Sequence, residues 1–291
     1  MLDELRRRLQ ALHQETGIDG DPGSLPLGIA AVDEALAGGL ARGALHEIAA
    51  ASEAHLPAAT GFVLGLAALS GNGRALVWIA EDMALAESGL PYGPGLDAFN
   101  LLPEHLLTVA VSHRRDLMSA MEEALRCRAV GAVIGEVRHG ALDAIAVRRL
   151  SLAATASGAL ALLLRAQPQT DASTAATRWI VGAAPSSSPS PGGGGSPSEA
   201  RWGGVTYAKS SPPPGALTRA DLPPPGGGER KYARPFEFGP PRFAAQLVRN
   251  RRGPAASWIL EWSDTDERFI LATPALPVAA PAFDRPRRKV A

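Results

Sequence analysis

Short apolar runs that alternate with segments of helical periodicity constrain the fold of this chain more than any other feature. Runs of six to eight mostly apolar residues are typical of strands buried on both faces of a sheet. They cover residues 44–49, 74–80, 106–111, 130–135 and 158–165. Residues 57–70, 116–128 and 142–157 predict helices between them. This alternation predicts an α/β fold with a mostly parallel sheet and helices on both faces.

The chain divides by composition into four parts. Residues 1–15 place Leu2, Leu5, Leu9 and Leu12 at helical spacing and predict an amphipathic helix, which lies on its own domain or docks on a partner. We expect a core domain over 16–182. Residues 183–228 are rich in Pro, Ser and Gly, a composition that cannot bury enough surface to fold, and they predict a disordered linker.

Residues 229–291 form the fourth part, a basic C-terminal segment. It contains 12 Lys/Arg and 7 Asp/Glu, although the whole chain has a formal net charge of zero. Residues 243–249 and 257–262 alternate apolar and polar positions around a turn, which predicts a β-hairpin. A strand at 268–271 could follow, and the hairpin tip could also cap the core sheet.

The location of the protein is predicted from what the sequence lacks. Cys127 is the single cysteine, so the chain can form neither an internal disulfide nor a cysteine-based zinc site. The first residues do not resemble a signal peptide, and no apolar run reaches the length of a membrane span. We therefore expect a cytoplasmic protein that does not contact a membrane.

Residues 49–60 occupy the place where a nucleotide-binding α/β protein carries its phosphate loop. Such a loop needs glycines to wrap the phosphates, a lysine for the β/γ-phosphates and a Ser/Thr for magnesium. Here no Gly, Lys or Arg lies between Ile48 and Gly61. We interpret the position as degenerate and expect no bound cofactor. Its residues are Ala49, Ala50, Ser52 and Thr60, with Glu136 at a neighbouring strand end. Weak anion binding at the helix N-terminus is the alternative.

Carboxylates follow two of the predicted strands, at Glu81, Asp82 and Glu136. In an ATPase of this shape, such groups would activate water and hold a metal ion. The other interpretation is that they are solvated or pair with Arg138 and neighbouring bases. The histidines lack metal-ligand spacing, and no nucleophile motif is present. We therefore expect no metal site and no catalytic residue.

Five side chains of the C-terminal segment are candidates for contacts with other molecules. Bases could stack on the aromatic rings and phosphates could bind the guanidinium groups. A positive segment after a linker also suits docking on a partner protein. Together with Leu5, Leu9 and Leu12 of the N-terminal helix, the candidates are Arg249, Arg251, Arg252, Trp258 and Trp262.

Several motifs resemble the ImuA family. They are His46-Glu47-Ile48, Trp78-Ile79, Tyr92-Gly93-Pro94-Gly95-Leu96, the acidic strand end at Glu136 and Ser157-Gly158. The resemblance covers residues 27–182 and, more loosely, the hairpin at 243–262. It implies a RecA-like core without recombinase activity. It also implies a role in SOS-induced, error-prone translesion DNA synthesis, beside the inactive polymerase relative ImuB and an error-prone polymerase.

The resemblance and the degenerate phosphate loop together predict a non-catalytic accessory protein that assembles these partners. RecA, and DNA through the basic C-terminal segment, are further candidate partners. Two alternatives remain open at this stage. One is a DNA-dependent ATPase or recombinase-like enzyme, and the other is a cell-division inhibitor similar to SulA, to which the ImuA family is more distantly related.

Overall fold

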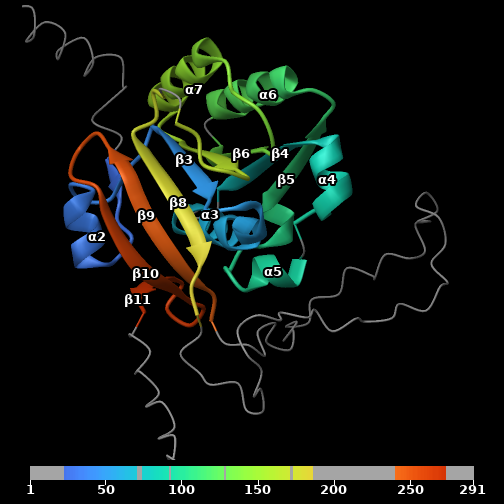
Figure 1. Ribbon diagram of the computed structural model, residues 1–291. Coiled ribbons are helices and arrows are strands. Elements are labelled where there is room, and N and C mark those ends of the chain that lie inside the picture. Colours follow the sequence, from blue (N-terminus) through green and yellow to red (C-terminus); the bar gives the residue numbers. More distant parts are fainter. Residues whose placement is uncertain are drawn as a thin grey trace, which may run out of the picture. The chain divides into compact units, whose positions relative to one another are not determined.

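The computed structural model describes residues 23–70, 74–91, 93–127, 129–170, 173–185 and 240–272. All of these residues fall in one compact unit (Figure 1). The helix expected over 1–15 and most of the linker expected over 183–228 lie outside the described residues, as do residues 229–239 and 273–291 of the C-terminal segment.

The described part of the chain is built on a nine-stranded sheet with the strand order β11-β10-β9-β8-β3-β7-β6-β4-β5. The six strands from β8 to β5 run parallel, and β9, β10 and β11 continue the sheet in antiparallel pairing. The strands are β3 (Leu45–Ala50), β4 (Ala75–Glu81), β5 (Leu106–Val111), β6 (Val130–Val137), β7 (Leu160–Arg165), β8 (Thr177–Ala183), β9 (Arg242–Asn250), β10 (Ala256–Ser263) and β11 (Arg268–Leu271).

The described helices lie between these strands in the chain. They are α2 (Ala30–Ala35), α3 (Leu56–Ser70), α4 (Asp82–Ser88), α5 (Gly93–Asp97), α6 (Arg114–Arg126) and α7 (Ala144–Ser157), with short 3₁₀ turns at Glu53–His55 and Pro103–His105. A two-stranded pair, β1 (Ser24–Leu25) with β2 (Leu40–Ala41), precedes β3. The predicted α/β class, with a mostly parallel sheet flanked by helices, is confirmed.

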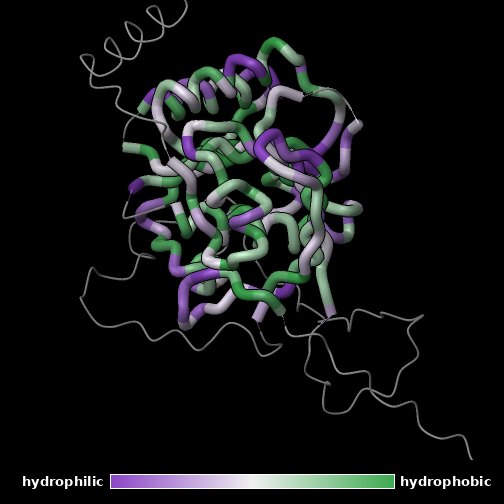
Figure 2. The backbone as a smooth tube through the Cα atoms, turned by 90° about the vertical axis from the view of Figure 1, so that its left-hand side faces the viewer, coloured by the Kyte–Doolittle hydropathy of each residue, from purple (hydrophilic) through white to green (hydrophobic). Residues whose placement is uncertain are grey.

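The sheet separates two hydrophobic cores. On one face, α2, α3 and the α5 region pack on alternate residues of the strands, such as Ile48, Ile134 and Leu162. On the other face, α6 and α7 cover the intervening residues, such as Val133 and Leu163. Figure 2 shows hydrophobic segments through the middle of the molecule and hydrophilic segments toward its outside. A parallel sheet needs both faces covered in this way because its strands are apolar on both sides.

Local sequence signals fix several of these elements. The Asp143 side chain accepts a hydrogen bond from the backbone N–H of Ile145 at the start of α7, and Gly158 ends that helix in the left-handed conformation with φ 72°. Between α2 and β2, Gly39 has φ 119°, and a Cβ atom there would collide with the backbone of Leu25. Only glycine therefore permits the close pairing of β1 with β2.

The C-terminal strands are part of the core. The sequence predicts 229–291 as a segment of its own, but β9, β10 and β11 continue the core sheet from β8. Phe243 of β9 and Phe269 of β11 lie on the Phe62 ring of α3, with ring centroids 5.8 and 5.2 Å from it. Gly65 of α3 allows this approach, because a Cβ atom there would lie 2.5 Å from the Phe269 ring. Burial of these aromatic side chains joins the segment to the sheet.

Candidate functional site

The phosphate-loop position forms the strand–turn–helix that the sequence predicts. Ala49 and Ala50 end β3 as buried residues, and α3 begins only six positions later at Leu56. Between them lie an exposed pair, Ala51 and Ser52, and the 3₁₀ turn that ends at His55. The connection is therefore a five-residue turn of about the length of a phosphate loop, but it contains neither glycine nor lysine.

Two backbone N–H groups of this turn donate to carbonyl oxygens within the protein. The N–H of Ala51 donates to the carbonyl oxygen of Val181 at 2.8 Å, which ties the turn to β8. The N–H of His55 donates to the carbonyl oxygen of Ser52 at 2.9 Å. The His55 ring also holds the end of β8, because its Nδ1 accepts from the N–H of Ala183 at 3.1 Å. These bonds fix the turn against the sheet.

The charge at this turn is also unsuited to a triphosphate. Glu53 is exposed and lies in the first turn of the 3₁₀ helix that leads into α3. A carboxylate there interacts favourably with the helix N-terminus and occupies the electrostatic role that a bound anion would have. Ser52 is exposed and Thr60 is half-buried within α3. A hydroxyl group with no lysine nearby in the sequence would bind a magnesium–nucleotide complex only weakly.

Glu136 lies near the carboxyl end of β6, on the same face of the sheet as α3, with a side chain that is about nine-tenths buried. Its two oxygens have different partners. Oε1 accepts from Nε of Arg138 at 2.7 Å, and Oε2 accepts from the indole Nε1–H of Trp78 at 3.2 Å. The guanidinium of Arg138 also donates to Ser88 Oγ, at the end of α4. Of the two interpretations weighed from the sequence, the geometry favours the pairing with Arg138.

The other strand-end carboxylates, Glu81 and Asp82, have partners of their own. Glu81 ends β4 and lies 3.9 Å from a guanidinium nitrogen of Arg114, while Asp82 begins α4 and accepts from the N–H of Met83 at 2.8 Å. In the described part of the chain, no group of three His, Cys, Asp or Glu side chains is arranged to hold a metal ion. The same residues include no helix long and apolar enough to cross a bilayer.

The two tryptophans proposed as contact residues of the C-terminal segment differ in their exposure. Trp262 is 1% exposed and donates its indole N–H to the carbonyl oxygen of Ala98, so its side chain belongs to the core and is not presented to a partner. The assignment of Trp262 to a contact surface therefore needs correction. The alternating pattern of β10 shows that every second residue lies on the same face of the strand. It does not show which of the two faces is buried. Trp258 is half-buried against Trp179, with ring centroids 6.0 Å apart.

The three arginines of the hairpin lie at or near its tip. Arg252 donates to the carbonyl oxygen of Ala37 at 2.7 Å, and the neighbouring Asn250 side chain donates to that of Ala35. The tip therefore caps the end of α2. Arg251 is exposed, and Arg249 donates to the carbonyl oxygen of Ser173 at 2.6 Å. Leu5, Leu9 and Leu12 lie outside the described residues.

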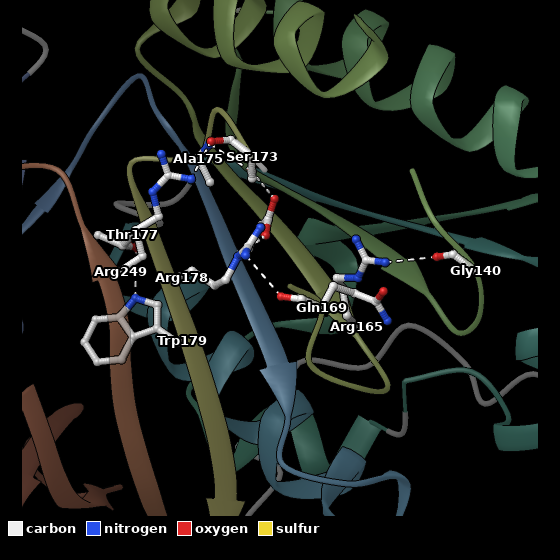
Figure 3. A network of polar contacts seen from close by, with 10 residues as sticks. Gly140, Arg165, Gln169, Ser173, Ala175, Thr177, Arg178, Trp179 and Arg249 are labelled. Atoms are coloured by element: carbon white, nitrogen blue, oxygen red, sulfur yellow. Dashed lines mark hydrogen bonds and ion pairs between the residues drawn. The ribbon is translucent and has the colours of Figure 1, made fainter. Parts of the chain in front are cut away.

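Sequence reasoning missed a polar network across β3, β8 and β9 (Figure 3). Glu47 is 3% exposed, accepts from Nε of Arg178 at 2.8 Å and also accepts from the Ser173 hydroxyl. Arg165 and Arg249 flank this pair, and together with Glu47 and Arg178 they line a cavity of about 520 Å³. The sequence did contain a signal for this network, since Glu47 lies inside an apolar strand and a buried carboxylate requires a partner.

His46 forms a second buried network on the opposite face of β3. Its Nε2–H donates to the carbonyl oxygen of Ala41 at 2.9 Å, which makes Nδ1 the acceptor of the Thr177 hydroxyl at 2.7 Å. The Thr177 oxygen in turn accepts from the indole of Trp179 at 2.9 Å. Burial lowers the pKa of His46 to about 4. This geometry makes His46 a hydrogen-bonded structural residue of the core.

These observations define an α/β protein whose phosphate-loop position carries a short turn without glycine or lysine. No family model matches the chain. The chain is 28% identical over 230 residues to Protein ImuA from two strains of Caulobacter vibrioides, NA1000 / CB15N and ATCC 19089 / CIP 103742 / CB 15, with 77% of each chain covered. This likeness confirms the resemblance to ImuA. Among solved structures, the chain is similar to the RadB recombinase, with a TM-score of 0.45, 12% identity, and coverage of 84% of this chain and 98% of that one.

Proposed function

We propose that this protein is a non-catalytic accessory protein of damage-induced, error-prone translesion DNA synthesis. In this role it holds an ImuB-like polymerase relative and an error-prone polymerase together. The likeness to Protein ImuA over 230 residues supports the proposal that this protein works in a mutagenesis cassette together with these partners. RecA and DNA are additional candidate partners for the same assembly.

The observation that carries the non-catalytic part of the proposal is the turn between β3 and α3. A nucleoside triphosphatase stabilises its transferred phosphoryl group with a glycine-rich backbone cradle, a lysine and a metal ion. Here the Ala51 N–H is bonded to Val181, and Glu53 places a negative charge at the start of the helix. Without a triphosphate, Glu136 has no magnesium to hold, and its two oxygens bind Arg138 and Trp78.

Two measurements test this proposal. Purified protein is assayed for ATP hydrolysis with and without single-stranded DNA, and we expect no turnover above the level of a mock purification. Turnover that Glu136→Gln abolishes, in a variant that remains folded, would contradict the non-catalytic role. In parallel, the ImuB-like partner carrying an affinity tag is used to capture the untagged full chain. Failure of capture from mixtures of purified proteins would contradict the accessory role.

A further inference from the structure

The two outer strands of the nine-stranded sheet, β11 and β5, present different edges. Within the described residues each has one neighbour in the sheet, β10 for the first and β4 for the second. The outer edge of each therefore carries backbone N–H and C=O groups that no other strand of the described chain binds. Proteins usually protect such edges by keeping the strand short or by placing charged residues or proline on it. β11 is protected in both of the first two ways, since it has four residues and begins with the exposed Arg268.

β5 lacks this protection. It has the sequence Leu-Leu-Thr-Val-Ala-Val over Leu106–Val111, six residues without a charge, a proline or a glycine. Leu107 is 59% exposed, although it lies inside the strand. An apolar strand of this length with a free edge is suited to pairing with a strand of another chain.

Large apolar side chains gather around this edge. Nine such side chains are exposed in the described residues, and four of them lie on β5, just before it, or on and just after α4. Helix α4 contacts β4 and β5 and lies beside them in Figure 1. The four are Met83 of α4, Leu90 after it, Leu102 before β5 and Leu107. Apolar exposure beside an open strand edge indicates a surface that another chain covers.

The charges at the two ends of β5 show which chain suits this edge. Glu104, just before the strand, and Arg115, just after it, are both exposed. In an antiparallel pair, the start of one strand lies beside the end of the other. Two copies of β5 paired in this way bring Glu104 of each chain near Arg115 of the other. Asp116 lies one position further on, in the first turn of α6, where the helix N-terminus favours a carboxylate.

From this open edge with complementary ends, we propose that two copies of the chain pair antiparallel through β5 and form one continuous sheet. The pairing is isologous, so each contact between the two chains occurs twice. It goes beyond the proposed accessory function and does not depend on it.

The apolar side chains of β5 also match one another in such a pair. Val109 and Val111 pack on the core beneath α6, and Leu107 shares their face by alternation. A two-fold axis perpendicular to the sheet at Val109 keeps this face continuous between the two copies. Leu107 of each chain then lies opposite Val111 of the other, and apolar cross-strand pairs of this kind stabilise a sheet. The arrangement buries the exposed Leu107 side chain.

Sedimentation equilibrium of the full chain over about 1–100 µM protein tests the pairing. We expect a dimer whose population grows with concentration. Leu107→Lys should raise its dissociation constant by at least about tenfold, because the edge then carries a charge in its apolar part. Leu152→Lys on α7 is the matched control, since this leucine is 62% exposed and lies away from β5, and it should leave the dimer unchanged. A monomer at every concentration, a trimer or larger assembly, or a dimer that Leu107→Lys leaves intact would overturn the proposal.

Charge exchange tests the antiparallel direction. Glu104→Arg and Arg115→Glu should each weaken the dimer about three- to tenfold, because each replaces two attractive contacts by repulsive ones. The double variant with both substitutions should restore the dimer, and thermal melting should show that all variants remain folded. A double variant as weak as the single ones would overturn the proposed pairing. Each of these results leaves the accessory function standing, because capture by the ImuB-like partner is measured separately.

Discussion

The side chain of His46 in β3 is joined to that of Thr177 in β8 by a hydrogen bond of 2.7 Å inside the core. Both residues are buried, and the Thr177 oxygen also accepts from the Trp179 indole. The bond links the strand that leads to the phosphate-loop position with the strand that holds its turn in place. It therefore stabilises the region around the phosphate-loop position.

Stability should fall in mild acid because of His46. Burial lowers the pKa of this group from 6.5 to about 4, so the folded state keeps the ring neutral where the unfolded chain takes up a proton. The contribution is complete above pH 6.5 and is lost as the pH falls toward 4, by about 3 kcal/mol in all. Urea unfolding measured between pH 7 and pH 4 checks this. In His46→Asn, the free energy of unfolding should fall less between pH 7 and pH 4 than in the unmodified chain. An equal fall in the two proteins would contradict the low pKa of His46.

Removal of the Thr177 hydroxyl should destabilise the same network. In Thr177→Val, the shape of the side chain is kept, but His46 Nδ1 and the Trp179 indole lose their shared partner. Leaving a buried polar group unpaired costs about 1–3 kcal/mol. The matched control is Thr177→Ser, which keeps the hydroxyl and should cost less. The free energy of unfolding in urea compares the two variants, and an equal or larger loss in the serine variant would contradict the network.

The Glu136–Arg138 pair should behave as a structural ion pair. Both side chains are about nine-tenths buried, so Glu136→Gln leaves the charge of Arg138 without its carboxylate. Breaking a buried pair typically costs about 3–5 kcal/mol. A double-mutant cycle with Arg138→Gln should show that the double variant loses less than the sum of the single ones. Independent, additive losses would mean that the two side chains do not stabilise each other.

Gly65 should tolerate no larger residue if the C-terminal strands pack on α3. A Cβ atom at this position would lie 2.5 Å from the Phe269 ring and 3.1 Å from the Trp262 ring. Overpacking of this kind costs about 1–3 kcal/mol, so Gly65→Ala should lower the melting temperature. Gly93→Ala is the control, since nothing lies within 4 Å of the added atom. Equal melting temperatures for the two variants would show that β11 does not pack against α3 at Gly65.

Much of the fold follows from the sequence because buried parallel strands are apolar on both faces. The run at 106–111 coincides with β5 and the expected strand at 268–271 with β11. Strands β3, β4, β6, β7, β9 and β10 begin and end within two residues of the predicted positions. The two-residue strands β1 and β2 were missed because Ser24–Leu25 is too short to show any periodicity. Helix α4 was also missed, since it follows β4 directly without a turn signal after Glu81.

The candidate site was harder to derive. The degenerate phosphate loop could be found from the absence of glycine and lysine alone. The partners of Glu47 could not, because Arg178 and Ser173 are more than 120 residues away in the chain and meet it only through the pairing of β3 with β8. The inward direction of Trp262 depends on the register of β10 against β9 and β11, which the alternation of a half-buried strand does not specify.

We expect that the turn between β3 and α3 does not hold a nucleoside triphosphate. Isothermal titration calorimetry of the full chain with magnesium ATP tests it most directly, with an active phosphate-loop ATPase titrated under the same conditions as a positive control. We predict no saturable binding up to about 1 mM, which corresponds to a binding free energy weaker than about −4 kcal/mol. Saturable binding in the micromolar range that is lost when Ser52 and Thr60 are both replaced by alanine would contradict the claim.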